Sequence, residues 1–274
     1  MATVHQKSAM PIAVHPERPK LRTRPLKALH HFRELVKDKE DTEQVFRIFE
    51  ALPRKSFRDE ALAFGMSEKG HAIHACEPYL PDILDDHRRL RAMPEDSVAH
   101  AYCDFMEKEG LTAAGLVAEG EKMRERSYGD MIEWYGGRSR DVHDLLHVLT
   151  GYGRDPVGEQ CVLAFTYGQE PSRAYIFIAY AGGYNVKKGT RTKAPIFRAI
   201  NEAKRLGKAC PHVCEECITD LLAEPLDAAR ERLNIARPKL YHAVHEALRA
   251  EGWSPYDLMA GNNRSEKARS AQTA

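Results

Sequence analysis

The sequence predicts a single all-α domain, and three observations carry this prediction. Apolar residues recur at intervals of three and four through most of the chain, proline and glycine stand where such segments begin and end, and no alternating apolar and polar run of comparable length competes. With 274 residues, of which 43% are hydrophobic, the chain can bury a sizeable core. We place the helical domain at residues 25–250.

Four segments show the helical spacing most clearly. Residues 41–52 (DTEQVFRIFEAL) open with a capping residue, and residues 95–110 (EDSVAHAYCDFMEKEG) repeat the same apolar pattern. Segments 193–207 and 224–235 place a proline near the helix start, and the first also places a glycine near its end. Residues 174–180 (AYIFIAY) have a composition that would also suit a strand.

The two ends of the chain differ from the domain in composition. Residues 1–24 are rich in proline and basic side chains, so we expect a flexible, solvated arm, with contact to an anionic membrane surface as the alternative. Residues 251–274 form a polar C-terminal tail that we expect to be flexible as well.

Charge and composition exclude several classes of protein. Lys and Arg together number 41 against 40 for Asp and Glu, so no overall field favours nucleic acid as a partner. The longest near-apolar stretch, residues 174–184, is shorter than the roughly 20 residues that a membrane-spanning helix needs. Residues 1–20 lack the pattern of a secretory signal and the six cysteines suit a reducing compartment, so we expect a cytoplasmic protein.

One stretch, HDLLHVLTGYGRDPVGE at residues 143–159, concentrates chemically active side chains. We expect Ser139 or Asp141 to cap a helix that ends at Gly151. The Asp155-Pro156 pair then starts a second helix, and the short connection predicts an antiparallel helical hairpin.

This hairpin predicts a metal site. His143 and His147 lie one turn apart, about 40° around a helix of 3.6 residues per turn, with Asp144 on the same flank. Glu159 lies in the first turn of the second helix, so it and His147 are both about 6 Å from the hairpin tip. Imidazole nitrogen and carboxylate oxygen are zinc ligands, so we predict a divalent metal held by these four residues. The alternative is that the histidines are ordinary, partly buried residues.

Two other enzyme classes share part of the pattern. Metalloproteases with an H-E-x-x-H motif use the glutamate as general base, whereas Asp144 is one methylene shorter, which disfavours a peptidase. An all-α histidine-aspartate metal-dependent phosphohydrolase needs a further histidine and aspartate. His87 or His100 with Asp220 could supply them, but nothing in their spacing selects them.

The motif resembles the signature of a known family. The pattern H-D-x-x-H-x11-E from His143 to Glu159 is similar to that of the coenzyme Q (ubiquinone) biosynthesis protein 4 family, and Arg140 just upstream also fits. Weaker matches follow in the same order: RPLKAL (24–29), MPEDSVAHAYCDFM (93–106) and LDAARERLNI (226–235). The resemblance covers about residues 25–235 and indicates a bacterial member.

The resemblance implies an all-helical, zinc-binding homodimer that is peripheral to the inner membrane. It implies a role in ubiquinone biosynthesis, where the ring C1 carboxylate of a polyprenylated 4-hydroxybenzoate-derived substrate is replaced by a hydroxyl, an oxidative decarboxylation. Asp144 and Arg140 would then be the catalytic groups. The alternative role is a non-catalytic, lipid-binding scaffold that organises other ubiquinone-biosynthesis enzymes. Iron(II) is the alternative metal.

The chain departs from the family pattern in the helix after the motif. Leu163 and Thr166 stand where the family commonly has lysine and glutamate. This loss of a charged pair leaves open a different prenylated ring as the substrate, whereas the metal ligands are unaffected.

A polyprenyl tail requires an apolar groove, for which we expect residues 174–184 to provide the wall. This segment is apolar around its circumference and carries two small residues. We assign the groove to Tyr175, Phe177, Gly182 and Gly183, with an ordinary buried core helix as the alternative.

Three cysteines, at positions 210, 214 and 217, have the C-x3-C-x2-C spacing of an iron-sulfur ligand set in radical enzymes. Those enzymes place the motif early in a barrel, and only 57 residues follow Cys217. The three thiols also continue an apolar stripe on a helix that Pro211 would start, so we predict core packing, with a structural metal site as the alternative.

Overall fold

The computed structural model describes residues 12–20, 22–37, 41–122 and 126–258. Within these ranges the chain forms α-helices and one short 3-10 helix, with two isolated β-bridges and no strand, which confirms the predicted all-α class. The helices in chain order are α1 (Pro25–Lys37), α2 (Thr42–Ala51), α3 (Phe57–Gly65), α4 (Glu68–Cys76), α5 (Leu80–Leu84), α6 (His87–Leu90), α7 (Val98–Glu109), α8 (Ala113–Glu121), α9 (Met131–Asp141), α10 (His143–Thr150), α11 (Pro156–Gln169), α12 (Arg173–Thr190), α13 (Ile196–Ala209), η1 (Val213–Glu215), α14 (Ile218–Ala223), α15 (Leu226–Arg232) and α16 (Lys239–Ala250).

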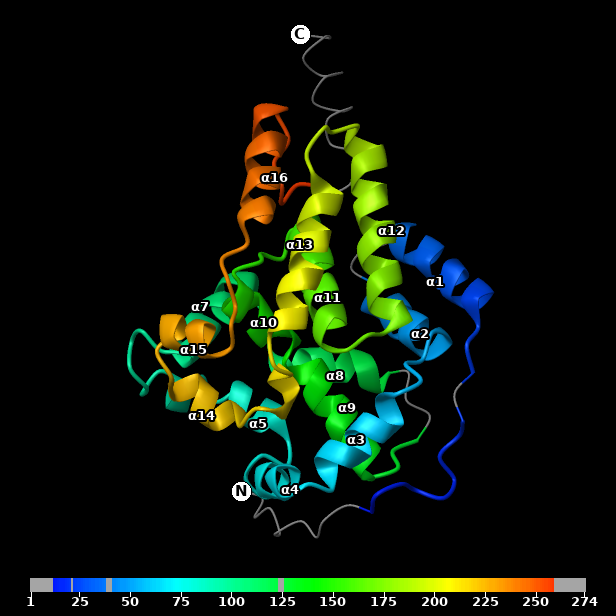
Figure 1. Cartoon of the computed structure of the whole chain (residues 1–274), viewed down its shortest axis with the longest axis vertical. Coiled ribbons are helices and arrows are strands. Elements are labelled where there is room, and N and C mark those ends of the chain that lie inside the picture. Colours follow the sequence, from blue (N-terminus) through cyan, green and yellow to red (C-terminus); the bar gives the residue numbers. More distant parts are fainter. Residues whose placement is uncertain (1–11, 21, 38–40, 123–125, 259–274) are drawn as a thin grey trace.

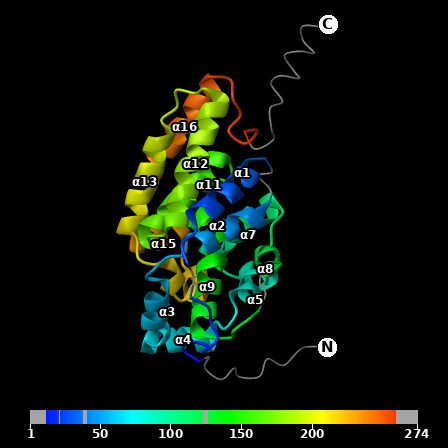
Figure 2. The same cartoon turned by 90° about the vertical axis from the view of Figure 1, so that its right-hand side faces the viewer.

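Helix α11 is the centre of the arrangement. It packs against α12 and α13 in the upper half of the molecule, while α10 packs against α7, α9 and α15 on the other side (Figure 1). The α1–α2 hairpin lies beside α12, as the side view also shows (Figure 2). Residues 174–180, which could have formed a strand by composition, belong to α12. None of the helices that the structure describes combines the length and apolarity needed to span a bilayer.

Glycines allow α11 and α13 to approach closely. A Cβ atom at Gly207 would overlap the carbonyl oxygen of Phe165, and one at Gly168 would overlap the backbone of α13 at Lys204. The glycine near the end of segment 193–207 therefore does not end the helix, which continues to Ala209. It is required because the two backbones are nearly in contact.

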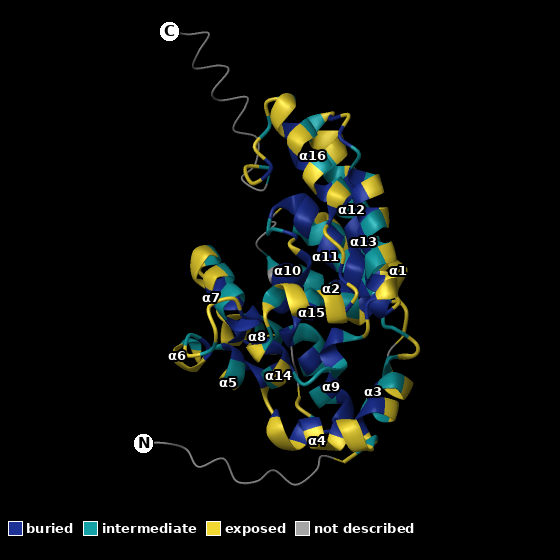
Figure 3. Ribbon diagram, turned by 60° about the vertical axis from the view of Figure 1, so that its left-hand side comes forward, coloured by how far each residue is buried: buried dark blue, intermediate teal, exposed yellow. Residues whose placement is uncertain are grey.

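The apolar core has two parts. The larger cluster includes the buried faces of α7, α10, α11 and α13, and a smaller cluster joins α1 and α2 to the start of α12 through Ala28, Ile48 and Ala174. Figure 3 shows the buried residues concentrated on the central helices, with exposed faces on α4 and α16. The α1–α2 hairpin thus packs on the domain as a separate apolar unit.

Part of the N-terminal arm differs from the expected flexible segment. Ile12 forms a β-bridge with Asp130, and the Arg18 guanidinium donates two hydrogen bonds to the Asp130 carboxylate, at 2.7 and 2.6 Å. Burial alone would raise the pKa of Asp130, but Arg18 and two backbone N–H groups hold this pKa below its usual range. Asp130 also caps α9 through the N–H of Glu133, so the arm is held at the start of that helix. Residues 1–11 and 259–274 lie outside the described residues.

The segment from Cys210 to Cys217 does not form the expected helix. Buried Arg138 donates to the carbonyl oxygens of Cys214 and Glu216, at 3.0 and 2.8 Å, and forms an ion pair with buried Glu77 at 2.9 Å. These carbonyls are therefore used by a side chain instead of a helix, and the segment forms only the short turn η1. Cys210 and Cys214 are nevertheless buried in the core, as predicted.

Replacing Gly207 by alanine tests the close approach of α11 and α13. We expect the Gly207→Ala variant to lose about 1–3 kcal/mol in free energy of unfolding, because the added methyl group must push the helices apart. Gly189→Ala on α12 is the matched control, since nothing lies within 4 Å of its Cβ position. The control should gain up to about 1 kcal/mol. Urea denaturation measures both, and an unchanged Gly207→Ala variant would contradict the close approach.

Candidate functional site

The helix that carries the two motif histidines begins differently from the prediction. Ser139 lies inside α9 and Asp141 is its last residue, so neither caps α10. Val142 has right-handed helical backbone angles and joins the two helices almost without interruption. Because α9 leads directly into α10, the first N–H groups of α10 need no side-chain cap.

The end of α10 and the start of α11 lie where the sequence predicts them. Helix α10 ends at Gly151, whose φ of 76° lies in the left-handed region that favours glycine. Asp155 caps α11 by accepting hydrogen bonds from the N–H groups of Val157 and Gly158, at 3.1 and 3.2 Å. Glu159 therefore lies in the first turn of α11, opposite α10.

The four predicted ligands lie at this hairpin in two overlapping groups. The Nε2 atoms of His143 and His147 each lie 3.5 Å from the same carboxylate oxygen of Glu159. Asp144 is buried, and its carboxylate lies within 4.8 Å of both imidazoles. The two histidines thus belong to both groups, one with Glu159 and one with Asp144.

The contacts of His147 determine which of its ring nitrogens faces Glu159. Its Nδ1 donates a hydrogen bond to the carbonyl oxygen of Tyr152 at 3.0 Å, and the ring of Phe105 stacks on the imidazole with centroids 5.4 Å apart. The proton is therefore on Nδ1, since a carbonyl only accepts. Nε2 is buried without a hydrogen-bond partner in the described structure. This buried nitrogen lone pair faces the Glu159 carboxylate and lies near His143 and Asp144, as expected for a metal ligand.

Charge also favours a cation at this point. Burial alone would raise the pKa of Glu159, but the two imidazoles hold this pKa well below its usual range. Burial would likewise lower the pKa of His147, but the Glu159 and Asp144 carboxylates raise it above the ordinary value. The imidazoles and the carboxylates thus stabilise positive charge between them, and a divalent cation would take the place of the proton on the imidazole.

Residues from the distant helix α16 support the hairpin. The hydroxyl of Tyr241 donates to the Asp155 carboxylate, and Nε2 of His245 lies 3.1 Å from the same oxygen. Tyr241 also accepts a hydrogen bond from the N–H of Gly153, in the loop between α10 and α11, at 2.9 Å. These contacts fix the residue that caps α11 and the loop before it. Sequence reasoning missed both side chains, because no local pattern connects positions 86 and 90 residues apart.

The candidate metal ligands border a large cavity. Its volume is about 1560 Å³, larger than the roughly 300–1,000 Å³ of typical small-molecule sites. His143, Asp144 and Glu159 line one part of it, whereas α1 and α2 contribute mostly apolar side chains, among them Phe32 and Phe49. The described part of the expected polar tail also contributes to the wall through residues 252–254, 257 and 258.

The predicted groove residues divide into two pairs. Tyr175 and Gly182 line the cavity, as predicted. Phe177 does not, because its ring packs edge-on against Phe32 in the smaller core cluster. Gly183 does not either, because it faces α13 at Ile200. A helix exposes only part of its circumference to one cavity, so the apolar segment divides between cavity and core.

Arginines lie near the candidate site. Arg140 lines the cavity, but its Nε donates to the neighbouring Asp141 at 2.7 Å. Arg154 was not predicted, and its Nε lies 3.6 Å from Glu159.

A second polar group occurs one helical turn before His143. Ser139 donates to the buried carboxylate of Glu170 at 3.1 Å, and Arg54 lies 3.4 Å from the same carboxylate. All three of these residues line the cavity.

The residues required by the phosphohydrolase alternative do not join this site. His87 lies beside Glu107, His100 contacts the carbonyl oxygen of Arg91, and Asp220 is exposed on α14. None of them belongs to the group of donors around His143 within the described ranges.

The fold and site define an all-helical protein with a histidine and carboxylate centre at the wall of a large cavity. The family model of the coenzyme Q (ubiquinone) biosynthesis protein Coq4 matches residues 62–239. The chain therefore belongs to the Coq4 family.

Two curated relatives and one solved structure show how much of the chain is similar to known proteins. Two curated relatives from Culex quinquefasciatus, the mitochondrial ubiquinone biosynthesis protein COQ4 homologs 2 and 1, are 32% identical over 96 residues. These matches cover 35% of this chain and only 41% and 34% of the two relatives. The crystal structure of a putative ubiquinone biosynthesis protein from Nostoc punctiforme is similar in fold, with a TM-score of 0.52 and 18% identity. That match covers 78% of this chain and 99% of the other.

Variants of Asp155 test its double role at the hairpin. Asp155→Ala removes the cap of α11, leaves Tyr241 without its acceptor and leaves His245 without its ion-pair partner, so we expect a loss of about 2–4 kcal/mol in free energy of unfolding. Asp155→Asn should lose clearly less, because asparagine caps helices as well as aspartate does. Chemical denaturation compares the two, and equal losses would contradict a capping role.

Proposed function

We propose that this protein acts in ubiquinone biosynthesis as a metal-dependent enzyme at ring C1 of a polyprenylated 4-hydroxybenzoate-derived substrate. The observation that carries the proposal is the position of the two imidazole nitrogens, each 3.5 Å from one oxygen of Glu159, with His143 and Glu159 at the wall of the cavity. Membership of the Coq4 family supports the pathway.

The residues fit a divalent metal, with zinc as the first candidate and iron(II) as the second. His143, His147 and Glu159 would hold it, and Asp144 would either complete the set or orient a ligand. Zinc bound there would supply a Lewis acid that takes a hard oxygen of the substrate and stabilises negative charge developing on the ring. The unpartnered Nε2 of His147 supports this assignment.

The chain's own groups would orient the aromatic acid and move its proton. Arg140 and Arg154 border the cavity on the ligand side and can attract a carboxylate. Asp144 is close enough to the imidazoles to serve as a base when it is not a ligand. The polar group of Ser139, Glu170 and Arg54 lies one turn away and can bind a ring oxygen substituent.

The net reaction must balance. Loss of the ring carboxylate as CO₂ leaves the electron pair of the broken carbon–carbon bond on C1, where it can bind a proton. Replacement of that hydrogen by hydroxyl is a further two-electron oxidation. The proposal therefore includes dioxygen as the two-electron oxidant, which is reduced to hydrogen peroxide, and water as the source of the hydroxyl oxygen.

The apolar part of the cavity suits the polyprenyl tail. Leu163 and Thr166 line the cavity at the positions where the family commonly has a charged pair. Because Leu163 follows Glu159 by one helical turn, the wall beside the candidate metal site is apolar there. We therefore propose a substrate whose ring carries fewer charged or strongly polar substituents on the side facing this wall than the substrate of family members that keep the charged pair.

The α1 helix supports a peripheral membrane location. Leu26 is 81% exposed and lies in the sequence among the basic residues Arg22, Arg24 and Lys27, the last of which pairs with Glu50 at 3.6 Å. An exposed apolar side chain beside basic residues suits an anionic membrane surface. A substrate drawn from the membrane would then meet the α1–α2 wall of the cavity.

Metal content tests the site directly. We expect the purified protein to contain about one equivalent of zinc or iron at the hairpin, and the His147→Ala and Glu159→Gln variants to lose it. His71→Ala on the exposed surface of α4 is the matched histidine control and should keep its metal. Elemental analysis of dialysed protein is the measurement, and equal metal content in all variants would contradict the site.

Pathway intermediates distinguish an enzyme from the scaffold that the family resemblance also allows. If the protein is an enzyme, cells that express the folded His147→Ala variant in place of the wild type should accumulate the carboxylated polyprenyl intermediate. Cells with the His71→Ala control should not. Lipid extracts analysed by mass spectrometry give the answer, and normal ubiquinone with His147→Ala would support the scaffold instead.

Vesicle binding tests the α1 surface. We expect Leu26→Glu to bind vesicles of anionic phospholipid at least about fivefold more weakly than the wild type, because an apolar anchor is replaced by a charge that the surface repels. Met66→Glu is the control, since Met66 is also an exposed apolar residue, 55% accessible, but lies at the end of α3. Cosedimentation measures both, and equal weakening would contradict a specific role of α1.

A further inference from the structure

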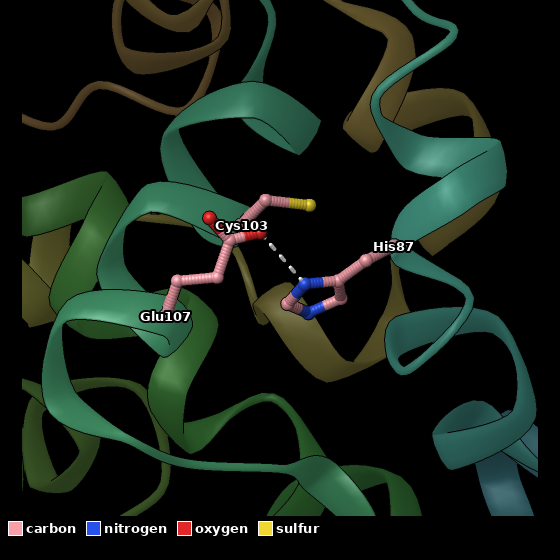
Figure 4. A group of neighbouring side chains, drawn as sticks. All are labelled: His87, Cys103 and Glu107. Carbon is pink, nitrogen blue, oxygen red and sulfur yellow. Dashed lines mark hydrogen bonds and ion pairs between the residues drawn. The ribbon is translucent and has the colours of Figure 1, made fainter.

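A second group of metal-binding side chains lies between α6 and α7. His87 is the first residue of α6, and Cys103 and Glu107 are one turn apart on α7. Their ligand atoms, one nitrogen, one sulfur and one oxygen, all lie within 4.8 Å of one another. Figure 4 shows the three side chains directed toward a common point. None of them lines the large cavity, so this group is separate from the hairpin site.

The spacing of the donors is close to that of a tetrahedral site. Nδ1 of His87 lies 3.1 Å from Oε1 of Glu107. Two ligands about 2.0–2.1 Å from a zinc ion at tetrahedral angles would be roughly 3.3 Å apart. The sulfur of Cys103 needs only a slightly longer bond of about 2.3 Å. Small side-chain adjustments would therefore complete three sides of a tetrahedron.

Neighbouring charges hold the carboxylate in place. The guanidinium of Arg91 donates to the other oxygen of Glu107 at 2.8 Å and forms an ion pair with Asp104 at 2.7 Å. Glu107 can thus bind a metal through Oε1 while Arg91 keeps Oε2, which is how outer partners orient a ligand carboxylate. The charges of Arg91 and Asp104 cancel, and a thiolate with a carboxylate balances a divalent cation.

Burial gives the three donors different access to solvent. Cys103 is buried, whereas 28% of the His87 side chain and 53% of the Glu107 side chain are exposed. An ion can therefore enter from the Glu107 side, and a water molecule can fill the fourth position. Burial raises the pKa of the Cys103 thiol to about 11, so metal binding would release a proton.

We propose that His87, Cys103 and Glu107 form a second site for a divalent transition metal, with zinc(II) as the ion that this donor set favours. The site links the short helix α6 to α7. It is independent of the hairpin site, because the two share no residue.

Cobalt(II) distinguishes the two sites. A thiolate bound to Co²⁺ gives a sulfur-to-metal charge-transfer band in the near ultraviolet, and the hairpin site has no sulfur donor. Titration of the full-length, reduced protein with Co²⁺ should produce this band, and Zn²⁺ should remove it. The Cys103→Ser variant should lose the band, whereas the His147→Ala variant should keep it. Failure of the hairpin proposal would therefore leave this result unchanged.

Further variants keep the test informative if Cys103→Ser does not fold. His87→Asn and Glu107→Gln change partly exposed side chains, and each should weaken Co²⁺ binding at this site at least tenfold, the lower bound for losing even an outer partner. Cys76→Ser, which alters an exposed thiol on α4, is the control and should keep the band. The proposal is overturned if the wild type gives no thiolate band, or if the band is unaffected by the Cys103, His87 and Glu107 variants.

Discussion

The geometry of the candidate site depends on the carboxylate of Asp155. One of its oxygens accepts the first free N–H groups of α11, and the other accepts the hydroxyl of Tyr241 and faces His245. The start of α11 is thereby fixed both along its own axis and against α16. Because Glu159 follows by one turn, the position of its carboxylate relative to the two histidines is fixed as well.

Burial of these polar groups holds the arrangement in place, but removing the groups from water costs free energy. Asp155, Asp144 and His147 are all buried, and each must find partners to offset the loss of water. Asp155 finds them in helix N–H groups and α16, and Nδ1 of His147 finds the Tyr152 carbonyl. Nε2 of His147 has no hydrogen-bond partner in the described structure, and a bound ion is one explanation for such a buried nitrogen. Elsewhere the Arg138 and Glu77 pair fixes α9, which leads directly into α10.

Much of the fold and the site could be predicted from local sequence. Helical spacing identified the class, the Asp155-Pro156 pair identified the start of α11, and Gly151 identified the end of α10. The predictions that failed involve the joining of two consecutive helices or contacts between distant segments. Ser139 and Asp141 have the composition of helix caps, but α9 continues into α10. The cysteine segment has a helical stripe, but Arg138 from α9 takes its carbonyl oxygens.

The sequence by itself determined what the motif could present: two imidazoles one turn apart, and a carboxylate in the first turn after a short connection. Those relations follow from the fixed rise and rotation of a helix, so they hold before any packing occurs. Only the tertiary structure decided which faces border the cavity, since Phe177 and Gly183 were lost to core contacts while Tyr175 and Gly182 were retained. It alone brought α16 to Asp155 and His87 to α7, because contacts between distant segments depend on how complete surfaces pack and leave no mark at either position in the chain.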